Sequence, residues 1–240
     1  MSKTQLISFK NPDALASLVA AAWLKEVAAA NQTGQPHCVA LSGGRITLKF
    51  FASVIEMSSA QNVSLVNVHF FWADERCVPP DDRESSFGAA NDAFFRPLGI
   101  AAGNIHRVLG ELSPARAAEQ ANAEIKRIVP QNAAGQPVLD VIFLGMGEDG
   151  HVASLFPRET EAERANVAVY RVITGSPKPP PNRVTLGYPA LVAAKQVWVL
   201  ASGTGKETAL KDSLSAGGKT PLGHVLQMRS HTKVFTDIVA

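Results

Sequence analysis

Short and almost continuously apolar runs recur along this chain, and this feature limits its possible folds most strongly. Apolar runs of four to eight residues without alternation are typical of parallel strands that are covered on both faces. Val, Phe, Leu and Ile dominate them. The runs are HCVALS (37–42), VHFFWAD (68–74), DVIFLGM (140–146), QVWVLAS (196–202) and KVFTD (233–237).

Segments with helix signals separate these runs. Asn11-Pro12 is a favourable N-cap and first-turn pair, and an Ala- and Leu-rich run to about Ala30 follows it. Further helix starts are expected at Ser113-Pro114, at Ser85 or Ser86, and over Glu207–Leu214. Strand–helix alternation predicts an α/β protein with a Rossmann-like three-layer fold, in which helices flank a mostly parallel sheet. Because no repeat or low-complexity linker interrupts the chain, we expect residues 1–240 to form a single domain.

Composition excludes several classes of protein. Hydrophobic residues make up 46% of the 240 residues and charged residues 18%, which suffices for an extensive core. The net charge of +2 argues against a nucleic-acid partner. No stretch approaches the ~20 apolar residues of a membrane span, and the opening MSKTQLISFK has no signal-like apolar run. Two cysteines make neither a disulfide framework nor a CxxC metal pair, so we expect a cytoplasmic protein.

The segments that follow the apolar runs are rich in glycine or charge. In open α/β sheets, ligands bind beyond the carboxyl ends of the strands, so one rim of the sheet is expected to gather these segments. They are LSGGR (41–45), WADER (72–76), GMGEDGH (145–151) and SGTGK (202–206).

GMGEDG fits the GxGxxG pattern of dinucleotide sites, but its surroundings do not. Such a site needs a full helix after the glycines and an acidic residue about 20 positions further on. Pro157 limits the next helix, and Tyr170 stands where the acid belongs. We therefore expect these glycines to permit a sharp turn and the close approach of a small ligand.

Asp149 and His151 are separated only by Gly150. They are either a turn-forming acid and a surface histidine, or an acid–base unit in which the carboxylate fixes the tautomer of the imidazole and raises its basicity. The spacing alone leaves both interpretations open.

Two of the segments suit an anion. SGTGK and LSGGR each place glycines and a cation, Lys206 or Arg45, at a helix start, where backbone N–H groups favour phosphate. WADER adds Asp74 and Arg76, which form either a salt-bridged edge or a hydroxyl- and anion-binding group. Cys77 is interpreted as structural, and no histidine has metal-ligand spacing.

Taken together, the motifs resemble the 6-phosphogluconolactonase family over almost the whole chain. That family carries an SGG loop, W-x-D-E-R, L-G-M-G-x-D-G-H-x-A-S-L-F-P, R-x-T-L and a G-x-x-K helix start. The matching segments are Ser42–Gly44, Trp72–Arg76, Leu144–Pro157, Arg183–Leu186 and Gly203–Lys206. One departure is the SGG loop, which usually continues S-T-P but here reads Arg45-Ile46-Thr47, so that Arg45 replaces a hydroxyl.

The resemblance implies hydrolysis of 6-phospho-D-glucono-1,5-lactone to 6-phosphogluconate in the oxidative pentose phosphate pathway, without a metal or an organic cofactor. It implies that His151 is the general base and that Asp149 orients it or a sugar hydroxyl. We expect the partner to be a small sugar-phosphate lactone and the protein to be a monomer or a homodimer. The expected substrate-binding residues are Gly43, Gly44, Arg45, Asp74, Arg76, Arg183 and Lys206.

Two other functions are considered. Glucosamine-6-phosphate deaminases share the D-G-H motif but typically continue I-A-F-N-E-P, with a catalytic glutamate. Here Leu155 and Phe156 occupy the Asn and Glu positions, which favours the lactonase. A non-catalytic sugar-phosphate sensor would keep the phosphate loops but would not need His151.

Overall fold

A computed structural model describes residues 3–238. Its main sheet has six parallel strands in the order β1-β9-β8-β5-β2-β3. The strands are β1 (Lys3–Ser8), β2 (His37–Leu41), β3 (Val68–Trp72), β5 (Val141–Gly145), β8 (Gln196–Ala201) and β9 (His231–Thr236). The five apolar runs are therefore strands of one parallel sheet, as predicted, and β1 is an additional edge strand.

A second sheet was not predicted. Three short antiparallel strands pair in the order β4-β7-β6, and they are β4 (Asp74–Arg76), β6 (Tyr170–Ile173) and β7 (Arg183–Leu186). The predicted strand 68–74 thus ends early, and Asp74 belongs to the second sheet. Ala73 connects the two sheets, because its N–H donates to Leu41 O and its carbonyl accepts from Leu186 N at 2.8 Å each.

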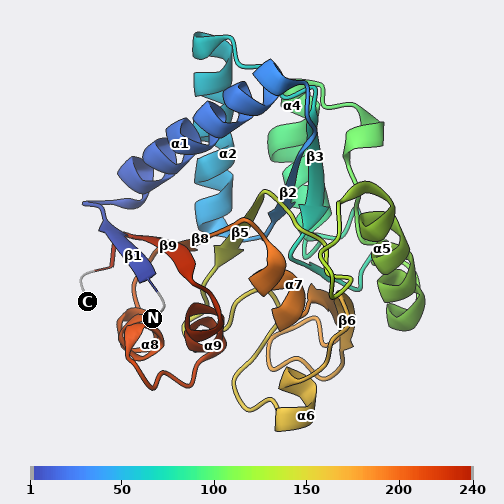
Figure 1. Ribbon diagram of the computed structural model, residues 1–240, viewed down its shortest axis with the longest axis vertical. Helices are drawn as coiled ribbons and strands as arrows, with labels where there is room; N and C mark the ends of the chain where they lie inside the picture. Colours follow the sequence, from blue (N-terminus) through green and yellow to red (C-terminus); the bar gives the residue numbers. More distant parts are fainter. Residues whose placement is uncertain (1–2, 239–240) are drawn as a thin grey trace.

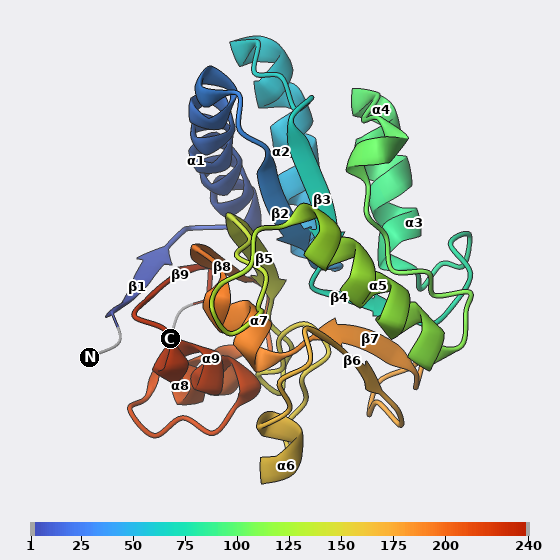
Figure 2. The ribbon, with the colours of Figure 1, turned by 45° about the vertical axis from the view of Figure 1, so that its right-hand side comes forward.

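Helices lie on both sides of the main sheet (Figures 1 and 2). In Figure 2, α1 and α2 lie side by side behind the strands, and α5 and α7 lie in front. The helices are α1 (Pro12–Thr33), α2 (Arg45–Gln61), α3 (Ser86–Ala90), a π-helical turn (Asn91–Phe95), α4 (Arg96–Leu98), a 3₁₀ turn (Ala102–Asn104), α5 (Pro114–Ile128), α6 (Glu161–Arg164), α7 (Tyr188–Ala193), α8 (Glu207–Leu214) and α9 (Pro221–Met228).

The helix starts follow the sequence signals. The Asn11 side chain accepts from Ala14 N at the start of α1, and Ser85 Oγ accepts from Gly88 N at the start of α3. Ser113 precedes α5 without a side-chain cap, and Glu207–Leu214 is α8. The α/β fold is confirmed.

One hydrophobic cluster joins the layers. Trp23 of α1 packs against Phe50 of α2 and Phe143 of β5, with ring centroids 5.7 Å apart in both pairs. The cluster also includes Leu186 of the second sheet. A continuous core is consistent with a single domain over residues 1–240, which stays a prediction. No helix within residues 3–238 is both long and apolar enough to cross a bilayer.

Candidate active site

The four glycine-rich or charged segments meet at a cavity of about 490 Å³. It opens at the carboxyl ends of β2, β5 and β8 and extends to the second sheet. Eight of the nine predicted site residues line it: Gly43, Gly44, Arg45, Asp74, Arg76, His151, Arg183 and Lys206. Asp149, the ninth, is hydrogen-bonded to His151. The rule that ligands bind at strand exits therefore located the cavity correctly.

The turn after β5 holds His151 in place. Gly147 N donates to His151 O at 2.9 Å, and Gly150 N donates to Gly147 O at 3.0 Å. Gly150 has φ 78°, and a Cβ on Gly147 would lie 2.0 Å from Nδ1 of His151. Both positions therefore need glycine, one for its backbone conformation and one for the close approach of the imidazole.

No helix follows these glycines directly. Val152 and Leu155 form an isolated bridge, and the next helix, α6, begins only after Pro157. Tyr170 is buried, and its hydroxyl donates to Trp72 O at 2.6 Å. The structural context of a dinucleotide fingerprint is absent from this segment.

Asp149 and His151 form a bonded pair. His151 Nδ1 lies 2.5 Å from Asp149 Oδ1, which also accepts from His151 N at 3.2 Å. A carboxylate bonded to Nδ1 selects the tautomer with hydrogen on that nitrogen, so Nε2 carries the lone pair. The geometry is that of a general base with an orienting acid.

Burial and the contact between the two side chains act in opposite directions on the pKa of each group in this pair. Burial lowers the pKa of His151 below its usual 6.5, and this effect outweighs the opposing influence of Asp149. Burial alone would raise the pKa of Asp149, but the hydrogen bond from His151 and its charge lower it overall. His151 is therefore neutral near pH 7 and able to accept a proton, although the carboxylate does not make it more basic than free histidine.

Phe156 forms an apolar wall beside the base. Its ring centroid lies 4.8 Å from that of His151 and 5.7 Å from the guanidinium carbon of Arg183. Phe156 is 7% exposed. Its ring therefore contributes to the burial that lowers the pKa of His151.

Asp74 is buried in a network that joins three motifs. Its Oδ2 accepts a 2.6 Å hydrogen bond from Ser154 Oγ and lies 4.0 Å from Nη1 of Arg183. Ser154 N in turn donates to Thr185 Oγ1 at 3.1 Å. The network fixes the carboxylate of Asp74 at the cavity wall. Ser154 was not predicted, although it lies within the A-S-L-F-P motif.

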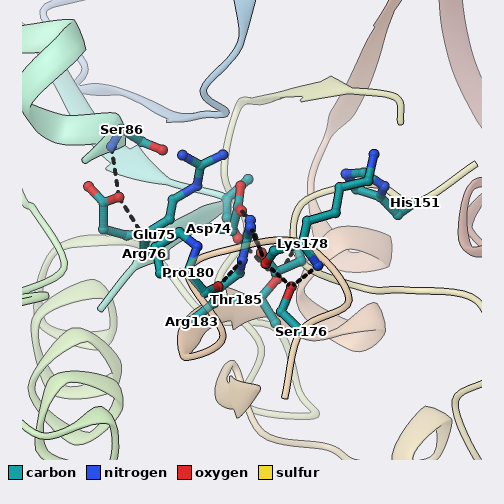
Figure 3. Close-up of polar contacts among 12 residues, drawn as sticks. Asp74, Glu75, Arg76, Ser86, His151, Ser176, Lys178, Pro180, Arg183 and Thr185 are labelled. Carbon is teal, nitrogen blue, oxygen red and sulfur yellow. Dashed lines mark hydrogen bonds and ion pairs between the residues drawn. The ribbon is translucent and has the colours of Figure 1, made fainter. Parts of the chain in front are cut away.

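Glu75 points toward Ser86, away from His151, and holds the backbone that carries Arg76 (Figure 3). Its two oxygens accept from the N–H groups of Arg76, Ser86 and Phe87 at 2.7, 2.8 and 2.7 Å. Burial raises the pKa of Glu75, and these three hydrogen bonds oppose the rise. Glu75 thus fastens the start of α3 to β4.

Arg76 and Arg183, the two arginines of the second sheet that line the cavity, differ in how many donors remain free. Arg76 donates from Nη1 to Glu84 O at 2.7 Å, and its buried Nε has no partner within the described residues. Arg183 is 4% exposed and donates from Nε and Nη2 to backbone carbonyls at 3.0–3.2 Å. Arg76 therefore keeps more of its guanidinium available for a ligand.

Cations gather where the SGG loop and the start of α8 meet. Arg45 is the first residue of α2, and Lys206 occupies the N-cap position of α8. Burial and the nearby charge of Arg45 both lower the pKa of Lys206. Lys49, one turn after Arg45, also lines the cavity and contacts Asp13 at 2.5 Å. Lys49 was not predicted, although its helical spacing from Arg45 would have indicated it.

The remaining candidates do not form a site. Burial raises the pKa of Cys77 to about 11, which is consistent with a structural thiol. Within residues 3–238, no group of three or more His, Cys, Asp or Glu side chains is placed to hold a metal ion. That the protein needs no metal or organic cofactor stays a prediction.

Residues 10–235 match the family of glucosamine-6-phosphate isomerases/6-phosphogluconolactonase. The chain belongs to this family. The 6-phosphogluconolactonase of Streptomyces coelicolor is 33% identical over 229 residues, which cover 91% of this chain and 86% of that protein. The structure of 6-phosphogluconolactonase from Thermotoga maritima is 27% identical, with a TM-score of 0.83 over 98% of this chain and 99% of that one.

The same fold also occurs in a deaminase. The structure of a monomeric glucosamine-6-phosphate deaminase superposes with a TM-score of 0.81 over 97% of this chain and 96% of that one, at 17% identity. At that identity the likeness shows the fold alone. Individual site residues, and not the fold, must therefore distinguish between the activities of the family.

Proposed function

We propose that this protein hydrolyses 6-phospho-D-glucono-1,5-lactone to 6-phospho-D-gluconate, in the oxidative pentose phosphate pathway. The observation that carries the proposal is the Asp149–His151 pair at a cavity lined by five lysine and arginine side chains, with an apolar ring against the imidazole. The names of the curated relatives support the same reaction.

The phosphate binds at the end of the cavity formed by the SGG loop and α8. Gly43 and Gly44 offer backbone N–H groups, and Lys206 and Arg45 offer charge. Arg76 adds a guanidinium from β4. Binding the phosphate there places the lactone ring toward His151 and Asp74, because both residues line the same cavity.

His151 then activates water. Its Nε2 removes a proton as the water oxygen bonds to the lactone carbonyl carbon, and the C=O π electrons move to the carbonyl oxygen. When that carbonyl re-forms, the bond to the ring oxygen breaks and His151 returns the proton to that oxygen. Asp149 stabilises the imidazolium between these steps. Asp74 and Arg183 orient the sugar from the second sheet.

Phe156 disfavours the deaminase alternative. In that branch a glutamate at this position supports ring opening, whereas here an aromatic ring contacts the base. A non-catalytic sensor would bind the sugar phosphate without consuming it. Such a sensor would not need a neutral, oriented His151.

We further propose that the enzyme acts in the cytoplasm as a monomer or a homodimer. It needs no metal, organic cofactor, nucleic acid or membrane in this proposal.

The test is hydrolysis of freshly prepared 6-phosphogluconolactone, followed by pH-stat or a dye-coupled assay. The lactone also opens spontaneously, so the rate without enzyme is subtracted. Release of acid in proportion to enzyme concentration supports the proposal. A rate equal to the blank, with the lactone bound but not consumed, would identify a sensor.

A further inference from the structure

Arg183 organises the proline-rich loop between β6 and β7. Its Nε donates to Pro180 O at 3.2 Å, and its Nη2 donates to Lys178 O at 3.1 Å and to Pro179 O at 3.0 Å. Three consecutive carbonyls thus point at one guanidinium. Hydrogen bonds to a charged donor are roughly twice as strong as neutral ones, so this segment is held firmly.

Arg183 is itself fixed by the active site. Its Nη1 donates to Ser154 Oγ at 3.4 Å and lies 4.0 Å from Asp74, and its guanidinium lies over the ring of Phe156. Phe156 in turn contacts His151. The loop is therefore anchored to the residues that surround the base.

Ser176 fixes the loop from its other side. Ser176 Oγ donates to Lys178 O at 2.8 Å and accepts from Lys178 N at 3.3 Å. Both polar groups of the Lys178 backbone are thereby bonded. Hydrogen bonds from Ser176 and Arg183 therefore fix the backbone position from which the Lys178 side chain extends.

The Lys178 side chain runs from this loop toward His151 (Figure 3). Its ammonium forms no hydrogen bond or ion pair with the residues in 3–238 that the structure describes. Its charge is close enough to contribute to lowering the pKa of His151, after burial. The other charged groups that act on the pKa of His151 are Asp149, in the same turn after β5 as His151, and Asp74 on β4. Among the described residues, the Lys178 ammonium is therefore a cation without a hydrogen-bond or ion-pair partner whose side chain extends toward the base.

We propose that Lys178 is a catalytic residue that stabilises the negative charge on the lactone carbonyl oxygen. This inference rests on the proposed hydrolysis. As water adds to the carbonyl carbon and His151 takes its proton, the oxygen gains a full negative charge. The Lys178 ammonium binds that oxyanion and keeps its own protons. When the C=O bond re-forms and the ring oxygen leaves with the proton from His151, the charge on the oxygen disappears.

This assignment gives the phosphate and the reacting carbonyl different cations. Arg45 and Lys206 line the phosphate end of the cavity, whereas the Lys178 side chain extends from a separate loop toward His151. An interaction made with the oxyanion alone raises kcat rather than lowering KM. Lys178 also acts electrostatically on Lys206, so a role in phosphate binding is the alternative that the experiment must separate.

The experiment compares Lys178→Met, Lys178→Arg and the control Lys25→Met, which removes an exposed lysine from α1. Each is assayed with phosphorylated and unphosphorylated glucono-1,5-lactone. Lys178→Met is expected to lower kcat by roughly 10²-fold on both lactones, the usual loss for one oxyanion donor, with little change in KM. Lys178→Arg keeps the charge and should recover part of the loss. Lys25→Met should match the wild type.

The pH profile separates catalysis from a structural role. Because a nearby cation lowers the pKa of His151, its removal should shift the acidic limb of kcat/KM to higher pH in Lys178→Met but not in Lys178→Arg. The melting temperature of each variant checks its folding. If Lys178→Met melts at a lower temperature than the wild type, Lys178→Gln is used for the same measurements.

Three results would overturn the inference. These are an unchanged kcat, a loss confined to KM for the phosphorylated lactone, and an acidic limb that does not move. An inactive wild-type enzyme would instead overturn the proposed hydrolysis.

Discussion

Ser154 Oγ donates a 2.6 Å hydrogen bond to Asp74 Oδ2, and this contact joins two segments 80 residues apart in the chain. Both side chains are buried. The bond fixes the carboxylate at the cavity wall and connects the loop that carries His151 to the second sheet. The WADER segment and the segment that contains Ser154 are thus parts of one structural unit.

Replacing Ser154 with Ala should destabilise the protein. The Asp74 carboxylate would lose a charge-assisted bond while remaining buried, which costs about 1–3 kcal/mol. Urea unfolding measures the change. Ser215→Ala, at an exposed position whose hydroxyl donates to Asp212 O, is the control and should stay within about 0.5 kcal/mol of the wild type. Equal stabilities of the two variants would contradict the role of the Ser154–Asp74 bond.

The pH profile should follow the pKa of His151. Because burial lowers this pKa, kcat/KM of the wild type should remain high near pH 6.5 and fall only at lower pH, as His151 becomes protonated. Asp149 raises the pKa of His151, so Asp149→Asn should move the acidic limb to still lower pH and reduce the plateau. A limb that moves to higher pH in this variant would show that Asp149 does not act on His151 as described.

Lys206 and Arg45 should bind the phosphate group of the substrate. Lys206→Ala should raise KM most, because Lys206 is partly buried at the N-terminus of α8. Arg45→Ala should raise KM less, because Arg45 is more exposed. A direct charge-assisted bond is worth roughly 1.5–3 kcal/mol. Both effects should vanish with unphosphorylated gluconolactone. Equal losses on the two lactones would mean that neither cation contacts the phosphate.

The enzyme should not deaminate glucosamine 6-phosphate. Phe156 packs against His151 where the deaminase branch has a glutamate, so no carboxylate supports ring opening at that position. Ammonia release is measured at several enzyme concentrations. Release that increases with enzyme concentration would place the chain in the deaminase branch.

Much of the main sheet follows from local sequence. The runs around Val39, Phe70 and Ile142 are apolar on both faces because helices cover both sides, and this pattern is specific to buried parallel strands. The edge strand β1 lacks it, since the sequence KTQLIS mixes polar and apolar residues. The apolar pattern therefore does not reveal β1, although it reveals β3 at the other edge.

The second sheet depends on pairing that no local pattern contains. Asp74 pairs with Thr185 across more than a hundred residues, and each of the three strands has only three or four residues. Strands this short carry too little pattern to be distinguished from loops in sequence. Their pairing is visible only in the structure, where Ala73 connects the two sheets through its backbone hydrogen bonds.

The candidate site was predictable in part, as the fold was. Glycines and charges at strand ends indicated His151 and Lys206, because parallel strands bring their carboxyl ends to one rim. The roles of Ser154 and Glu75 depend on tertiary hydrogen bonds between distant segments. Lys178 lies in a proline-rich loop whose place beside the base is set by Arg183. The spacing of residues in the sequence does not predict these hydrogen bonds from Arg183 to the loop carbonyls.

The central claim is that His151 activates water for attack on the lactone. The most direct measurement is the turnover of fresh 6-phosphogluconolactone by His151→Ala, beside the exposed-histidine control His231→Ala and a blank without enzyme. His151→Ala should lose about 10²-fold or more of kcat, the usual contribution of a general base, while 6-phosphogluconate binds almost as in the wild type. His231→Ala should keep full turnover. Near-wild-type turnover by His151→Ala would contradict the mechanism.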